Sequence, residues 1–156
     1  MIQIVKDTRP WFFLQTTHST YGMRVMETGH LEHLYYGERI TVDTQDPSSC
    51  APLVIQRAFA PGNTCTYDRE HPQISMEDIC LEVSTLGKGD IREPFLEVRF
   101  ADGSVTSDFT FDSYEIITLK EKEQCLQDSG LPHSYSEAET DSAECLQIVL
   151  QDVTNH

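Results

Sequence analysis

Two histidines, His30 and His33, lie three residues apart and carry the imidazole ligands that zinc and other transition metals bind. The residues around them alternate between apolar and polar as in a β-strand. Strand positions three apart point to opposite faces, so the two imidazoles cannot share one ion. The sequence therefore predicts no metal site, and we expect His33 to flank the core beside Tyr35.

Other catalytic patterns are also missing from the sequence. There is no Gly-x-Ser-x-Gly nucleophile motif, and the cysteines form no Cys-x-x-Cys pair; they lie at 50, 65, 80, 125 and 145. Gly87-Lys88-Gly89 lacks the third glycine and the following helix of a phosphate loop. The 26 Asp and Glu residues single out no acid/base pair. We expect no catalytic residue, metal or cofactor in this chain.

The segment from Gly87 to Pro94 has the composition of a tight structural crossing. Gly87 and Gly89 allow backbone conformations that other residues resist. Asp90 and Arg92 share a face if the segment is extended. Pro94 then removes one backbone donor just before a strand. We expect these residues to fix the crossing between two sheet elements.

Composition limits the partners. The chain has 156 residues and a net charge of −15, with 38% hydrophobic residues, which is typical of one folded domain or a part of one. The negative charge disfavours nucleic acid and anionic membranes. A neutral sugar or a protein is compatible with it. No apolar run approaches a membrane span, and the N-terminus has no signal-peptide pattern, so we expect a cytoplasmic protein with reduced thiols.

Alternating residues indicate strands along most of the chain. The expected strands cover 2–5, 11–16, 21–27, 31–36 with a continuation at 39–42, a three-stranded meander at 95–119, and 146–150. The meander would turn at Asp102-Gly103, a hairpin signal, and at Asp112-Ser113. About nine strands and almost no helix predict an all-β, antiparallel β-sandwich.

Two stretches predict irregular structure. Residues 43–80 contain four prolines and few β-branched pairs, which is typical of a functional loop or of a segment ordered by a partner. Ser75 could cap one helical turn there. Residues 120–142 are polar and acidic, as in a long loop.

Five blocks, in this order, resemble the N-terminal domain of the α-galactosidases of glycoside hydrolase family 36. They are Gly29-His30-Leu31-Glu32-His33-Leu34-Tyr35-Tyr36-Gly37, similar to Gly-x-Leu-x-His-(Leu/Val)-Tyr-(Tyr/Trp)-Gly; Arg57-Ala58-Phe59, similar to Asp-Arg-x-Phe; the segment from Ser84 to Pro94, similar to Ser-x-x-Gly-x-Gly-Asp-(aromatic)-Arg-x-Pro; Gly130-Leu131-Pro132 with Tyr135; and the strand from Ala143 to Leu150. The resemblance implies a large, supersandwich-like domain ahead of a catalytic barrel. Residues 1–156 would be a truncated part of that domain, without the barrel.

The resemblance also implies a function. Members of this family remove terminal α-linked galactose, from oligosaccharides such as raffinose or melibiose, by retaining hydrolysis with two aspartates. Both aspartates lie in the barrel, so this chain alone is expected to be inactive. In tetrameric members, loops of this domain reach a neighbouring subunit's sugar site.

The resemblance suggests candidate sugar-binding residues. The acid that family members carry before Arg-x-Phe is Gln56 here, followed by Arg57. Gln56 retains hydrogen-bonding capacity without the carboxylate charge. Arg57 could instead form a structural ion pair. Of the adjacent Tyr35 and Tyr36, one should face outward, and Tyr36, next to Gly37, is our candidate for an exposed ring that contacts sugar.

Two hypotheses follow. The first is a scaffold that packs beside its own barrel, builds a homo-oligomer and lends loop 56–75 to a neighbouring sugar site. The second is a free-standing β-sandwich that binds carbohydrate or protein without enzymatic activity.

Overall fold

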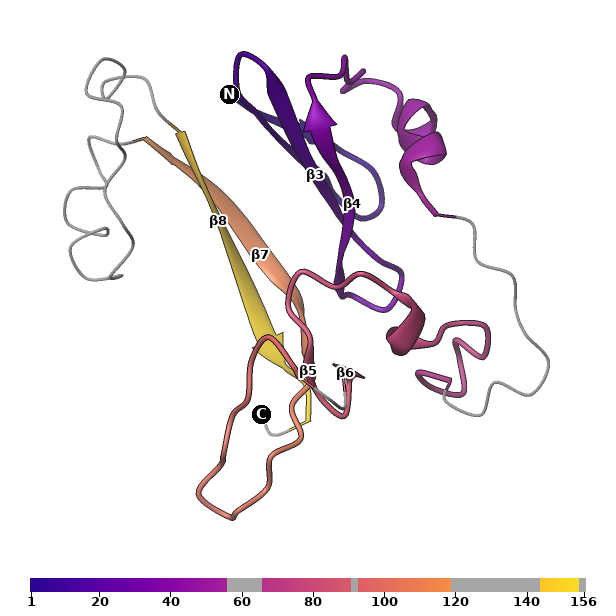
Figure 1. Cartoon of the computed structure of the whole chain (residues 1–156), viewed down its shortest axis with the longest axis vertical. Helices are drawn as coiled ribbons and strands as arrows, with labels where there is room; N and C mark the ends of the chain where they lie inside the picture. The colour runs from indigo at the N-terminus through magenta and orange to yellow at the C-terminus, as the bar shows by residue number, and fades with distance from the viewer. Residues whose placement is uncertain (56–65, 91–92, 119–143, 155–156) are drawn as a thin grey trace.

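A computed structural model describes residues 1–55, 66–90, 93–118 and 144–154 (Figure 1). Within these residues the elements are β1 (Ile2–Val5), β2 (Trp11–Gln15), β3 (Ser19–Val25), β4 (Leu31–Glu38), the 3-10 helices η1 (Pro47–Leu53) and η2 (Met76–Asp78), β5 (Thr85–Leu86), β6 (Gly89–Asp90), β7 (Phe109–Thr118) and β8 (Glu144–Asp152). The all-β prediction is confirmed. No helix of the described residues is long and apolar enough to cross a membrane.

The first four strands form one antiparallel sheet in the order β1-β2-β3-β4. Each strand pairs with the next along the chain, so short local turns set the register. The register shifts once, between Gly22 and Met23. Gly22 also lies under the ring of Phe13, where a Cβ atom would approach the Phe13 Cε1 atom to 2.9 Å. Glycine is therefore required for this close packing.

Both faces of the four-stranded sheet are covered. Phe12 is fully buried on one face, against residues of β7 and β8 that include Phe111 and Tyr114. The Phe12 ring lies 5.1 Å from that of Tyr114, edge to face. Phe13, on the other face, packs in a cluster with Cys50 of η1. Neighbouring strand residues point to opposite faces, and both faces are covered at β2. The strand is therefore apolar from Trp11 to Leu14 without alternation.

The second layer is the antiparallel pair β7–β8, which lies beside the four-stranded sheet (Figure 1). The two layers form the sandwich predicted from the alternation. The register of the pair shifts between Phe111 and Ser113, which leaves Asp112 as a bulge residue. Asp112 is exposed there, so its charge remains in water.

The meander expected at 95–119 is wrong. Residues 95–108 contain no strand, only a bridge between Thr85 and Leu96. The turn at Asp102-Gly103 is present, with Gly103 at a φ of 87°, but no strands flank it. Asp112-Ser113 lies within one continuous strand, β7. Pairing with the distant β8 outweighed the local turn signal of these two residues.

Smaller differences lie elsewhere. Residues 39–42 do not continue the sheet. One helical turn forms at η2 with Ser75 at the N-cap, but the Ser75 side chain makes no capping bond. Segment 80–82 instead lines β4: the His33 amide donates to the Cys80 carbonyl at 2.7 Å, and the Glu82 amide to the Leu31 carbonyl at 3.0 Å.

Replacing Phe12 by alanine should lower the free energy of unfolding by about 4 kcal/mol, because it leaves a cavity between the two layers. Urea denaturation followed by tyrosine and tryptophan fluorescence measures this. The matched control is Phe95→Ala, since the Phe95 side chain is 75% exposed and should change stability by less than about 0.5 kcal/mol. Equal losses in both variants would contradict the described core.

Candidate functional site

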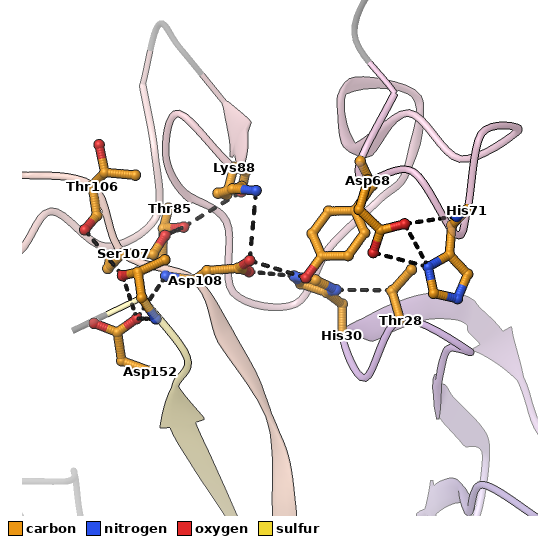
Figure 2. Close-up of polar contacts among 12 residues, drawn as sticks. Thr28, His30, Asp68, His71, Thr85, Lys88, Thr106, Ser107, Asp108 and Asp152 are labelled. Carbon is orange, nitrogen blue, oxygen red and sulfur yellow. Dashed lines mark hydrogen bonds and ion pairs between the residues drawn. The ribbon is translucent and has the colours of Figure 1, made fainter. Parts of the chain in front are cut away.

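A buried carboxylate with three side-chain partners, Asp108, lies directly before β7. Asp108 is only 3% exposed. Its Oδ1 atom lies 2.7 Å from His30 Nε2, and its Oδ2 atom accepts a hydrogen bond of 3.0 Å from the Tyr67 hydroxyl. Lys88 Nζ lies 3.7 Å from the same Oδ2 atom. Figure 2 shows Asp108 between Lys88 and His30. We call these four residues the Asp108 cluster.

A tight turn before β4 places His30 in this cluster. Gly29 has a φ of 87°, which favours glycine, and the Met26 amide donates to the His30 carbonyl at 2.8 Å. The Gly29 carbonyl accepts from the Phe111 amide at 2.8 Å. The turn is therefore docked on the first part of β7 at Phe111, three residues after the buried Asp108.

Tyr67 enters from the irregular segment that precedes η2. Its amide donates to the Ile74 carbonyl at 2.7 Å, which closes a compact loop. Its ring meets His30 edge to face at 5.0 Å, and Lys88 Nζ lies 4.7 Å from the ring centroid. The loop is held to the sandwich by a hydrogen bond, a ring contact and a cation–π contact together.

The electrostatics of the cluster favour an ionised Asp108. Burial alone would raise the pKa of this carboxyl, but the hydrogen bond and charge of His30, the Tyr67 hydroxyl and Lys88 outweigh it and lower the pKa. An ionised carboxylate only accepts, so His30 Nε2 carries the proton that it donates. Burial and Asp108 together raise the pKa of Tyr67 above its ordinary value, which keeps its hydroxyl a donor.

The backbone of Asp108 extends the cluster to β8. Its amide donates to Asp152 Oδ1 at 3.0 Å, and its carbonyl accepts from the Val153 amide at 2.9 Å. The Ser107 carbonyl accepts from the Thr85 hydroxyl at 2.6 Å. The cluster thus joins the turn before β4, the Tyr67 loop, the β5–β6 turn and the end of the β7–β8 pair at which β7 begins and β8 ends. Its polar groups are turned toward one another and hold these segments together, and we refer to this arrangement as a clamp.

A second, more open group lies on β3 and β4. Glu82 accepts a 2.5 Å hydrogen bond from the Tyr21 hydroxyl, and its other oxygen lies 3.1 Å from His33 Nδ1. Tyr21 packs against both His33 and Tyr36. The Tyr36 ring is 73% exposed. Its role as a sugar contact stays a prediction.

The structure describes only some of the other predicted residues. Gln56, Arg57 and Arg92 lie outside the described residues. Gly87 turns the chain between β5 and β6 with a φ of 83°, and Gly89 and Asp90 form β6, which pairs in parallel with β5 through Leu86 and Asp90. His30 and His33 bond different carboxylates, Asp108 and Glu82.

Sequence reasoning missed Asp108, Tyr67 and Lys88. Asp108 lay within the meander expected at 95–119, whereas the structure buries this aspartate before β7 begins. Its partners come from residues 30, 67 and 88, so no local spacing connects them. The only local signal was the polar pair Ser107-Asp108 directly before an apolar strand.

Comparisons with known proteins agree with the motifs. The family model described as "Glycosyl hydrolase family 36 N-terminal domain" matches residues 29–156, which confirms the resemblance. The bifunctional alpha-galactosidase/sucrose kinase AgaSK of Mediterraneibacter gnavus is 34% identical over 97% of this chain and 15% of its own length.

Solved structures give the same result. An alpha-galactosidase from Lactobacillus brevis superposes with a TM-score of 0.73 at 28% identity, over 96% of this chain and 19% of that one. A variant of the Geobacillus stearothermophilus alpha-galactosidase AgaA in complex with raffinose has a TM-score of 0.62 at 26% identity, over 91% and 18%. The chain therefore spans less than a fifth of the length of these relatives.

Substituting Asp108 by asparagine should lower the free energy of unfolding by about 3 kcal/mol at pH 7, because the amide offers one acceptor oxygen where the carboxylate accepts from both His30 and Tyr67, and its NH2 group then faces a donor. Tyr67→Phe, which removes only one hydroxyl, should cost about 1 kcal/mol. Urea denaturation measures both. A loss in Asp108→Asn no larger than that in Tyr67→Phe would contradict the clamp.

The same comparison should depend on pH. Because the folded pKa of Asp108 is lowered, its contribution is complete above the unfolded value of about 3.9 and is lost as pH falls through the folded pKa. The stability difference between the natural chain and Asp108→Asn should be constant from pH 5 to 7 and shrink below about pH 4. Urea midpoints measured across this range test it; a difference that grows at low pH would refute the ionised carboxylate.

Proposed function

This chain belongs to the family of glycosyl hydrolase family 36 N-terminal domains, and we propose that it forms the N-terminal β-sandwich portion of an α-galactosidase. The match of residues 29–156 to the family model, together with the sandwich itself, carries the proposal. Residues 1–156 would be one part of that domain, and the catalytic barrel would lie outside them.

The parent protein would remove terminal galactose from oligosaccharides such as raffinose or melibiose. Two carboxylates perform retaining glycoside hydrolysis, one as nucleophile and one as acid/base. Both would belong to the barrel, so this chain contributes no catalytic residue. Two observations support the substrate class: the named activity of the relatives, and the raffinose and stachyose bound in structures of AgaA.

This chain would contribute to the enzyme by holding other parts of it in place. It would pack beside its barrel, build a homo-oligomer and lend residues 56–75 to the sugar site of a neighbouring subunit, where Gln56 and Arg57 would contact the substrate. The Asp108 cluster supports this role, because Tyr67 ties the later part of this segment to the rigid sandwich. Catalytic geometry needs such positioning, since a displacement of about 1 Å costs roughly a hundredfold in rate.

The remaining assignments follow from composition and backbone. Gly87, Gly89, Asp90 and Arg92 would shape the crossing between sheet elements. A net charge of −15 suits a neutral sugar better than nucleic acid or an anionic membrane. Cys50, Cys80 and Cys145 are free thiols, in keeping with a reducing cytoplasm.

A chimera tests the scaffold role. This chain would replace the matching segment of the Mediterraneibacter gnavus relative, and raffinose hydrolysis and oligomeric state would be measured. We expect the chimera to be active, whereas the relative without the segment should lose about a hundredfold in kcat/KM. The chain alone should release no galactose.

Two results would contradict the scaffold role. One is full activity of the relative without its segment. The other is an inactive, well-folded chimera combined with sugar binding by the isolated chain, which would favour the free-standing module.

In the active chimera, Gln56→Asp should lower KM for raffinose about fivefold with kcat nearly unchanged. A charged acceptor strengthens a hydrogen bond by about 1 kcal/mol in substrate and transition state alike. Gln56→Asn is the matched control, because it has the same length without the charge. If both variants behave alike, Gln56 does not contact sugar.

A further inference from the structure

Three rings lie next to one another on β3 and β4. The Tyr21 ring centroid is 4.9 Å from that of His33 and 6.0 Å from that of Tyr36. Tyr21 and Tyr36 are direct partners across the strand pair, so their side chains share a face of the sheet. Tyr21 is partly buried between its neighbours, while the Tyr36 ring at the end of the row is 73% exposed. The exposed ring is an apolar platform open to a ligand.

Glu82 holds the other end of the row in place. Its two oxygens bond the Tyr21 hydroxyl and His33 Nδ1. Because a carboxylate oxygen accepts, His33 Nδ1 is the donor in this bond, and Nε2 is the ring nitrogen not used in it. The His33 and Glu82 side chains are 26% and 18% exposed, so a small ligand can reach both.

The carboxylate is organised before any ligand arrives. Segment 80–82 is pinned to β4 by two backbone hydrogen bonds, His33 amide to Cys80 carbonyl and Glu82 amide to Leu31 carbonyl. Strand β2, which pairs with β3, has buried side chains on both faces. Binding here would therefore order few side chains, which lowers its entropic cost.

The chemistry of the row selects a class of ligand. A net charge of −15 disfavours an anion. An organic cation is typically held by several aromatic rings, whereas Tyr36 is the strongly exposed ring of this row. Sugar hydroxyls both donate and accept, and the C–H face of a pyranose packs on an aromatic ring. A neutral saccharide therefore suits the polar groups of Glu82 and His33 in the same row as the exposed Tyr36.

We propose that Tyr36, His33 and Glu82 form a saccharide-binding site on the β3–β4 side of the sheet, with Tyr36 as the platform and His33 and Glu82 as hydroxyl partners. The site needs neither the barrel nor a neighbouring subunit. It therefore goes beyond the scaffold role and is separate from residues 56–75.

The test is an NMR titration of the purified chain with raffinose, galactose and, as a polyol without a ring, sorbitol. Raffinose should cause saturable shifts in the ring signals of Tyr21, His33 and Tyr36, and sorbitol should not. Tyr36→Ala should weaken binding at least tenfold, and Tyr36→Trp should retain it, since a larger ring still provides the platform. Glu82→Gln should weaken binding several-fold.

Phe95→Ala is the matched control, because Phe95 is an aromatic residue of similar exposure outside the row. It should bind like the natural chain, and circular dichroism shows whether each variant is folded. Shifts that never saturate, equal loss in Phe95→Ala and Tyr36→Ala, or unchanged binding in Tyr36→Ala would each overturn the site. Saturable shifts confined to residues 66–75 would also overturn it while supporting a sugar role for that segment. The chimera reports on the scaffold role independently.

Discussion

The buried charge of Asp108 brings together the segments around the beginning of β7. An ionised carboxylate away from water is tolerated only when it is paired and hydrogen-bonded. Asp108 meets this requirement with three partners from three distant segments, His30, Tyr67 and Lys88. Each partner brings its own segment to the start of β7. Loops that contribute little apolar surface are thereby placed as firmly as the strands, because displacing any of them would leave a buried charge poorly compensated.

The four-stranded sheet supplies the rigidity on which this clamp rests. Phe12 and Phe13 are adjacent, fully buried and on opposite faces, so β2 is enclosed between the β7–β8 pair and the η1 segment. A sheet covered on both faces has little freedom to bend or slip in register. Under the proposed scaffold role, such a frame would hold loops in place for an active site elsewhere, where errors of position are costly in catalysis.

Two kinds of polar group therefore coexist on this frame. The Asp108 cluster is closed, and its donors and acceptors are matched with one another. The row ending at Tyr36 is half open: Glu82 orients Tyr21 and His33, while the far ring faces solvent. The Asp108 cluster stabilises the structure, whereas the row ending at Tyr36 has groups that a ligand can reach, as the proposed saccharide site requires. Burial, and not residue type, distinguishes the two, since both contain a histidine, a tyrosine and a carboxylate.

The sequence by itself determined the all-β class, the strands of the first sheet and the family, because those strands alternate clearly and pair with their neighbours across short turns. Tertiary structure alone decided the rest. Asp112 and Ser113 predicted a turn, yet they lie inside β7. The pairing of β7 with β8 continues past them because Asp112 is accommodated as a bulge. Asp108 lay within an expected strand region, yet it is buried before β7 begins, because partners far apart in the chain compensate its charge. The alternation of apolar and polar residues indicates which face of a strand is buried. Long-range strand pairing and charge compensation depend on segments that meet only in the folded chain, so the sequence pattern does not reveal them.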